Sequence, residues 1–183
     1  LKSGFAFLPF TAGIIVVAGI ASQLLPKVGP KPLMVPGLLA DAIGLLLLTR
    51  ITPETAYVTH VLPSLIIMSS GMALVFIPLT STSLHAVSNH DSGVASAMVN
   101  TSQQIGGSLG TALLNTIAAT ASTSYIASHQ SFGKLAVPFG LVHGFTQSFK
   151  VGALLLTLGA VFLAIFINVG KDSLVETEGT IVH

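Results

Sequence analysis

Long apolar runs alternate with short polar breaks along this sequence, and the breaks hold most of its charges. Between Lys2 and Lys27 there is no charged residue. A helix rises about 1.5 Å per residue, so roughly 20 residues cross the ~30 Å hydrocarbon core of a bilayer. This run is therefore long enough to span a membrane as a helix. It lacks the strict alternation of apolar and polar residues that is typical of a β-barrel strand.

The same reasoning predicts an all-α, polytopic bundle of five membrane-spanning helices. Charges and turn-forming residues separate the helices, notably the three prolines within 26–32, the region around Arg50 and the polar loop 85–91. Residues 120–145 are expected to form an external connector, and residues 171–183 a polar tail. The predicted spans are 3–25, 33–50, 61–84, 92–121 and 145–169, all within one transmembrane domain that covers 1–170.

Composition supports lipid as the main solvent of this chain. Hydrophobic residues make up 51% of the 183 residues and charged residues only 7%, whereas a soluble domain usually carries about 25% charged residues. A net charge of +1 without a basic cluster argues against nucleic-acid binding. The absence of cysteine excludes disulfides and thiolate metal sites. The chain begins with Leu1 instead of Met, which favours a piece of a longer protein.

Polar side chains recur at helical spacing along the predicted span 92–121. On a helix they form one stripe, flanked by Gln103, because successive members are three or four residues apart. The stripe consists of Asn100, Gln104, Ser108, Thr111 and Asn115. Polar amides are costly in hydrocarbon without partners, so the stripe must face other helices or a water-filled cavity. Both interpretations stay open, although five stacked polar residues exceed what a single helix contact needs.

Small residues form a second pattern in the same span. Gly106, Gly107 and Gly110 leave little side-chain volume, and Gly106 and Gly110 are four residues apart. Such pairs let the backbone of another helix approach closely in a membrane. We expect these glycines to lie at a helix-packing interface.

Asp41 is the only acidic residue deep within a predicted span. A carboxyl group at membrane depth is a candidate proton carrier or cation partner. The alternative is a protonated, purely structural aspartate, since no predicted span offers a Lys or Arg at similar depth. The histidines lack the spacing of a metal site, and His85 and His90 are interpreted as solvated loop residues. No metal or cofactor is therefore predicted.

The polar span resembles a known membrane family. The segment SGVASAMVNTSQQIGGSLGTALL (92–114) is similar to the penultimate helix of the fourteen-helix drug:proton antiporters of the major facilitator superfamily, the EmrB/QacA type. Those helices carry a similar run of glycine, asparagine, serine or threonine, and glutamine. Further segments agree with that family in the same order, namely 3–13, 24–48, 70–84 and 143–160.

This resemblance implies that the five spans correspond to the last five of fourteen, a partial C-terminal domain whose partners include the missing N-terminal helices. The loop with Lys27, Gly29 and Lys31, and the tail 171–183, would be cytoplasmic in a bacterial inner or plasma membrane. One departure is Pro26 followed by Lys27, where the family often has an acid followed by arginine. The missing acid argues against a charge-relay gate in this loop.

The resemblance also implies a mechanism of alternating access, in which inward proton flow drives export of drugs or other amphipathic small molecules. The polar stripe would line or support the central cavity. Asp41 would map to a peripheral helix, and most proton-coupling residues would lie outside this chain. The alternative is a truncated or accessory membrane protein without transport activity. A membrane enzyme ranks last, because it needs clustered His, Asp or Glu at membrane depth.

Overall fold

The structure is a computed structural model that describes residues 2–85, 87–88 and 90–166 of the chain. All regular structure in these ranges is helical, which confirms the predicted all-α fold. The long helices are α1 (Lys2–Val28), α2 (Lys31–Leu48), α3 (Leu62–His85), α4 (Ser92–Ser128) and α5 (Ala136–Phe166). A π-helical turn, η1 (Tyr57–Val61), precedes α3, and a 3-10 segment, η2 (Gln130–Leu135), joins α4 to α5.

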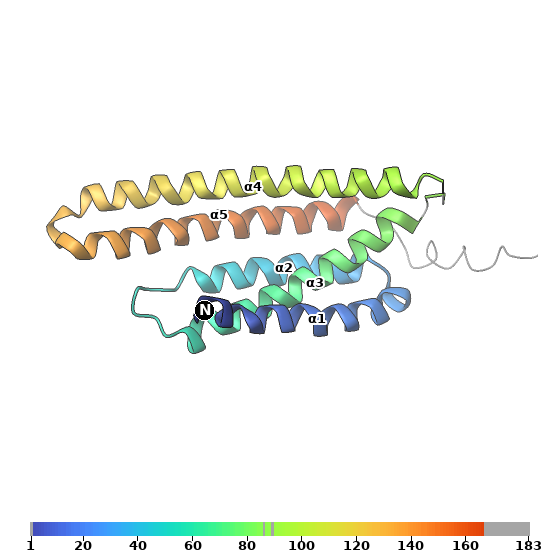
Figure 1. The fold of residues 1–183 in the computed structure, drawn as a ribbon, viewed down its shortest axis with the longest axis horizontal. Coiled ribbons are helices and arrows are strands. Elements are labelled where there is room, and N and C mark those ends of the chain that lie inside the picture. Colours follow the sequence, from blue (N-terminus) through green and yellow to red (C-terminus); the bar gives the residue numbers. More distant parts are fainter. Residues whose placement is uncertain (1, 86, 89, 167–183) are drawn as a thin grey trace, which may run out of the picture.

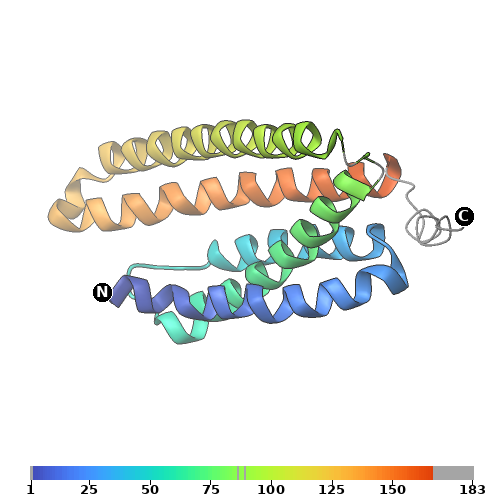
Figure 2. The same ribbon diagram turned by 45° about the vertical axis from the view of Figure 1, so that its right-hand side comes forward.

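The helices pack as a bundle in which their order in space differs from their order in the sequence. α1 packs on α3, α3 packs on α2, α2 packs on α5, and α5 packs on α4. α2 therefore lies between α3 and α5, and α4 lies at one edge alongside α5, as both ribbon views show (Figure 1, Figure 2). α4 has only a minor contact with α3.

The outer surface of this bundle is apolar. Among the described residues, four helical segments are long and apolar enough to cross a membrane: 4–28, 31–48, 57–83 and 136–166. Large side chains such as Phe5, Ile15 and Phe166 are about two-thirds exposed, which suits contact with lipid rather than water. α4, which holds the predicted span 92–121, is more polar than these four segments and is not among them. It nevertheless runs beside α5 through the same layer (Figure 1).

The break between the first two helices is shorter than predicted. We expected the helix to end before Pro26, but α1 continues through this residue to Val28. A proline in the last turn removes only one backbone hydrogen bond, so the helix can include it. The chain turns at Gly29, whose φ of 81° is easily reached only by glycine, and Pro30 then leads into α2.

The prediction of an external connector over 120–145 is wrong, because α4 continues to Ser128 and α5 begins at Ala136. The Thr123 and Ser128 hydroxyls donate hydrogen bonds to backbone carbonyls within the same helix, which lets polar residues continue it. The first, fourth and fifth helices are thus longer than their predicted spans, whereas α2 and α3 match theirs in length and are shifted by one or two residues. The last predicted residues of the fifth span, 167–169, and the tail 171–183 lie outside the described residues.

Small residues set the closest helix contacts. A Cβ added at Gly37 of α2 would lie 2.9 Å from the Gly71 carbonyl oxygen of α3, and one at Gly44 would lie 3.2 Å from the Ser64 carbonyl oxygen. At the α4–α5 contact, Gly140 and Gly144 play the same part, facing Ser122 and its neighbours. Close approach of backbones at small residues is how membrane helices associate.

Candidate functional site

The polar stripe of α4 points away from the rest of the bundle. Its five residues, Asn100, Gln104, Ser108, Thr111 and Asn115, are all exposed. α4 instead contacts α5 through Leu114, which lies beside the stripe, and through Ala118 and Ser122, which follow Asn115 at helical spacing and are buried near Gly144 of α5. The stripe therefore flanks the α4–α5 contact and does not form it.

Within the described residues, the stripe is not used for hydrogen bonding between helices. The Ser108 hydroxyl donates to the Ile105 carbonyl oxygen of its own helix at 3.0 Å. No hydrogen bond to another helix is found for the amides of Asn100, Gln104 or Asn115 in the part of the chain that the structure describes. Beside the stripe, Gln103 is half-buried, and its Nε2 is buried without a partner among the described residues. The exposed amides of Asn100, Gln104 and Asn115 are thus available to groups outside this bundle.

The glycines of the same helix are also uncovered. A Cβ added at Gly106, Gly107 or Gly110 would meet no atom within 4 Å. The tight helix contacts of this bundle use other glycines. The predicted packing of a helix against these three positions therefore stays a prediction, and it concerns helices beyond the ones described.

Asp41 lies near the middle of α2 and faces α3. It follows Gly37 by four residues and precedes Gly44 by three, so the glycines that bring α2 close to α3 also place Asp41 on this face. A Cβ added at Gly71 would lie only 2.7 Å from the Asp41 Cγ. The absence of a side chain at Gly71 therefore makes room for this carboxyl group.

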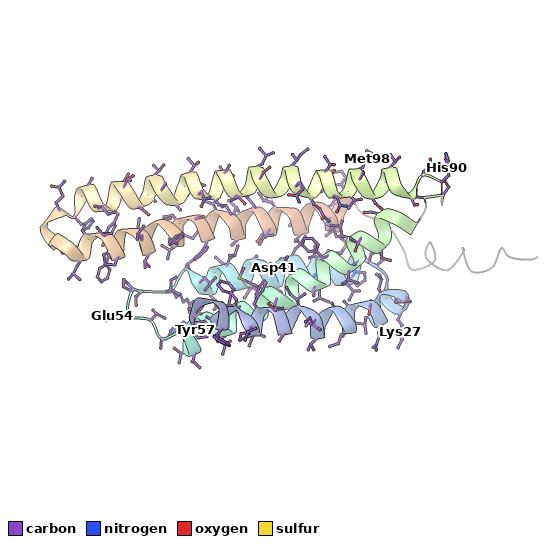
Figure 3. The ribbon with its side chains drawn as sticks, in the orientation of Figure 1. Lys27, Asp41, Glu54, Tyr57, His90 and Met98 are labelled. Carbon is purple, nitrogen blue, oxygen red and sulfur yellow. The ribbon has the colours of Figure 1, made fainter. Side chains whose placement is uncertain are left out.

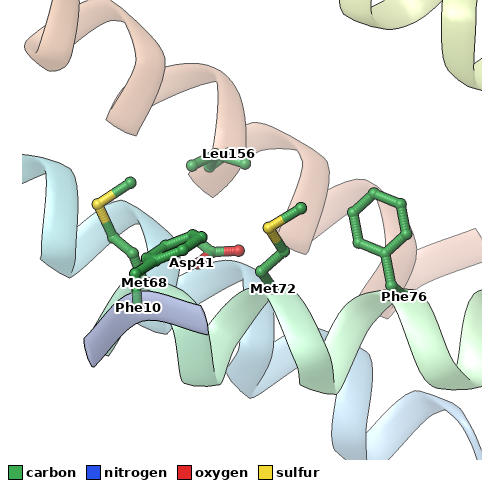
Figure 4. A pocket seen from close by; sticks show the side chains of 6 residues that line it. All are labelled: Phe10, Asp41, Met68, Met72, Phe76 and Leu156. Carbon is green, nitrogen blue, oxygen red and sulfur yellow. The ribbon is translucent and has the colours of Figure 1, made fainter. Parts of the chain in front are cut away.

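Asp41 opens onto a cavity of about 260 Å³. The cavity is lined by Phe10, Asp41, Met68, Met72, Phe76 and Leu156, which come from four helices. Figure 4 shows the carboxyl group between the two methionines on one side, with Leu156 of α5 across from them. The other lining residues are apolar, so Asp41 supplies the only charged group of this cavity among the described residues. We call this cavity the Asp41 groove.

The predicted basic loop lies at one end of the bundle. Lys27 is exposed in the last turn of α1, Gly29 forms the turn, and Lys31 begins α2. Lys27 and His90 lie at the same end of the molecule, whereas Glu54 lies at the opposite end (Figure 3). Among the described residues, no group of three or more His, Cys, Asp or Glu could hold a metal ion.

These features define a polytopic helical membrane protein with one polar helix face at the edge of its bundle. The sequence profile of the Major Facilitator Superfamily matches residues 1–111, which is more than half of the chain. The chain therefore belongs to this superfamily.

Relatives with known names agree with this assignment. The chain is 42% identical over 180 residues to the puromycin resistance protein pur8 of Streptomyces alboniger, covering 96% of this chain and 35% of the relative. It is 26% identical over 180 residues to the lincomycin resistance protein LmrB of Listeria monocytogenes, covering 93% of this chain and 38% of the relative. It is 31% identical over 132 residues to the cephamycin export protein CmcT of Amycolatopsis lactamdurans, covering 70% of this chain and 27% of the relative. The chain thus spans about a third of the length of these relatives, or less.

Sequence reasoning identified Asp41 but missed the residues around it. Phe10 and Leu156 belong to helices whose positions next to α2 cannot be read from periodicity. The spacing of Gly37 and Gly44 was an available signal, because two glycines seven residues apart mark one helix face on which Asp41 also lies. Met68 and Met72 carry no signal that distinguishes them from other apolar residues of α3.

Proposed function

We propose that the chain forms part of a proton-driven exporter of drugs or other amphipathic small molecules that works by alternating access. Membership of the superfamily and the names of the relatives, which refer to resistance and export, support this proposal. The observation that carries it is the exposed polar stripe of α4. A polar stripe of this length on a bundle that is otherwise coated with apolar side chains needs a water-filled space or further polar helices.

In this proposal, α4 faces the other half of the transporter across the substrate pathway. Alternating access is largely a rocking of one bundle against another around a central site. A helix at the edge of its bundle, with a polar face toward the partner bundle, is suitably placed for that role. The protein would lie in the bacterial plasma membrane, with the Lys27–Lys31 turn on the cytoplasmic side, and would act as a transporter rather than an enzyme.

The test removes polar groups of the stripe in the protein at full length. Asn100→Leu and Gln104→Leu are expected to lower substrate efflux severalfold, because each replaces an amide that faces the pathway with an apolar group of similar size. Efflux of a fluorescent substrate from cells and the amount of protein in the membrane are measured together. Thr116→Val is the matched control, because Thr116 is exposed on another face of α4 and its hydroxyl bonds only to the Ala112 carbonyl oxygen of its own helix.

Unchanged efflux in both stripe variants at normal expression would reject the pathway role of α4. A loss of efflux in Thr116→Val as large as in the stripe variants would show that any change to α4 is harmful. Absence of efflux in the unmodified protein would favour a membrane protein without transport activity.

A further inference from the structure

The turn between α4 and α5 extends farther than the other helices at its end of the bundle (Figure 1, Figure 2). A Cβ added at Gly152 of α5 would lie 3.0 Å from Leu45 of α2, so these two residues lie at the same level. α5 begins at Ala136 and α2 ends at Leu48, so at 1.5 Å per residue α5 continues about 20 Å past the end of α2. A hydrocarbon layer that covers α2 therefore leaves the α4–α5 turn outside it.

A cavity of about 300 Å³ lies at this turn. It is lined by Tyr125 from α4, Phe132 and Leu135 from η2, and Phe139 from α5. We call this cavity the turn pocket. Phe132 and Leu135 are more than half exposed. Large apolar side chains that gather around a cavity outside hydrocarbon are typical of a ligand site, because their exposure to water is unfavourable.

Stacked rings hold two of the lining side chains in place. The Tyr125 ring stacks on the His129 imidazole, with ring centroids 4.1 Å apart, and on the His143 imidazole of α5 at 4.9 Å. The His129 ring also contacts the Phe132 ring at 5.4 Å. His129 Nδ1 donates a hydrogen bond to the Tyr125 carbonyl oxygen at 3.0 Å. Tyr125 and Phe132 are thus positioned before a ligand arrives, which lowers the entropic cost of binding.

The lining of the turn pocket favours a flat ring over a flexible chain. Three of its four lining side chains are aromatic. Aromatic rings in stacked or edge-to-face contact are stabilised beyond the burial of their area. A volume of about 300 Å³ is at the lower end of small-molecule sites, which suits one compact ring system.

The charges along these two helices favour an anion. Lys134 lies in η2 between Phe132 and Leu135, and the sequence has no acidic residue from 92 to 171. A ligand with a negative charge therefore meets attraction and no repulsion from this part of the chain, whereas a cation meets the reverse.

We propose that the turn pocket binds the aromatic ring of a small organic anion, with Tyr125, Phe132 and Phe139 around the ring and the anionic group toward water. The pocket lies outside the hydrocarbon layer, and Tyr125 follows the last residue of the polar stripe, Asn115, by ten residues. The inference therefore goes beyond the proposed function and does not depend on transport.

Binding is measured with probes that separate ring from chain and anion from cation. The protein at full length is reconstituted in lipid nanodiscs, and tritiated 2-naphthoate is titrated against it, with empty nanodiscs as the background. Saturable binding of this aromatic anion is expected. Decahydro-2-naphthoate has the same carbon skeleton and charge without aromatic rings, and should compete about tenfold less well. Undecanoate, a flexible chain, and 2-naphthyltrimethylammonium, a cation, should also compete poorly.

Variants then locate the site. Phe132→Leu keeps an apolar side chain and removes one ring, so it should weaken binding of 2-naphthoate severalfold and leave decahydro-2-naphthoate unaffected. Phe139→Leu provides a second test if Phe132→Leu does not fold. Phe145→Leu is the matched control, because Phe145 is exposed on α5 and does not line the turn pocket. It should bind 2-naphthoate like the unmodified protein.

Several results would overturn the inference. Unchanged affinity for 2-naphthoate in both Phe132→Leu and Phe139→Leu would remove the turn pocket as its site. Equal competition by decahydro-2-naphthoate would remove the preference for a ring, and stronger competition by undecanoate would indicate a site for lipid chains. Competition by 2-naphthyltrimethylammonium as strong as by unlabelled 2-naphthoate would contradict the assignment to anions.

Discussion

At the scale of single residues, the packing of α2 against α3 in the middle of the bundle depends on the absence of a side chain at Gly71. The Asp41 carboxyl group and the Gly37 carbonyl oxygen both occupy the space that a side chain at position 71 would need. One missing methyl group therefore lets α2 and α3 approach closely and lets a carboxyl group fit between them. Gly71 thus links the packing of the bundle to the shape of the Asp41 groove.

Gly71→Ala is expected to destabilise the protein, because the new Cβ would lie 2.5 Å from the Gly37 carbonyl oxygen and 2.7 Å from Asp41 Cγ. Overpacking of this kind typically costs about 1–3 kcal/mol. Thermal unfolding in detergent, followed by circular dichroism, should show a lower midpoint. Gly19→Ala is the control, since Gly19 is exposed on α1 and an added Cβ there meets no atom within 4 Å. Equal midpoints for Gly71→Ala and the unmodified protein would contradict this view of the α2–α3 contact.

Residue-level prediction from the sequence reached Asp41 but not its surroundings. An acid within an apolar run is visible in the sequence because its transfer into lipid is so unfavourable. Phe10 and Leu156 become its neighbours only through the order in which helices pack, with α3 between α1 and α2, and α2 between α3 and α5. That order depends on contacts between distant segments, which leave no periodic signal.

At the scale of helices, α4 differs from the others because its exposed surface has two kinds of patch. The polar stripe and the glycines Gly106, Gly107 and Gly110 are both uncovered, whereas Ala118 and Ser122 lie buried against α5. The periodicity of the sequence predicted where this helix begins, at residue 92, and which residues share the stripe. It missed the end of the helix, because serine and threonine near residue 120 resemble a loop in composition while their hydroxyls bond within the helix.

The uncovered glycines of α4 allow a test of their predicted role in packing. In these 183 residues alone, Gly106→Val should leave the thermal midpoint unchanged, because no described atom lies within 4 Å of an added Cβ. In the protein at full length, the same change should lower the midpoint and the efflux rate if a further helix packs there. Gly144→Val should lower the midpoint in both cases, since an added Cβ would collide with Ala118 and Ser122. A neutral result for Gly106→Val at full length would reject the packing role.

At the scale of the whole molecule, the two ends of the bundle give the orientation a simple test. The proposal places the Lys27–Lys31 turn in the cytoplasm, so the loop with Glu54 at the opposite end faces outside (Figure 3). A membrane-impermeant thiol reagent added to intact cells should label Glu54→Cys and fail to label Lys27→Cys. These 183 residues contain no cysteine, and any cysteine elsewhere in the protein at full length is replaced by serine, so that each label reports a single site. Labelling of Lys27→Cys alone would reverse the orientation.

A hydrocarbon environment explains most structural features of this chain, including its exposed phenylalanines and the close helix contacts at its glycines. The exception is the polar face of α4, and the proposed function depends on water reaching that face. The most direct measurement is the reaction of single cysteines along α4 with a small, water-soluble thiol reagent in membranes that hold the protein at full length. Cysteines at Asn100, Gln104 and Ser108 should react readily, while one at Phe162, exposed on α5, should not. Unreactive stripe positions, or reaction at Phe162 as fast as along the stripe, would contradict the account.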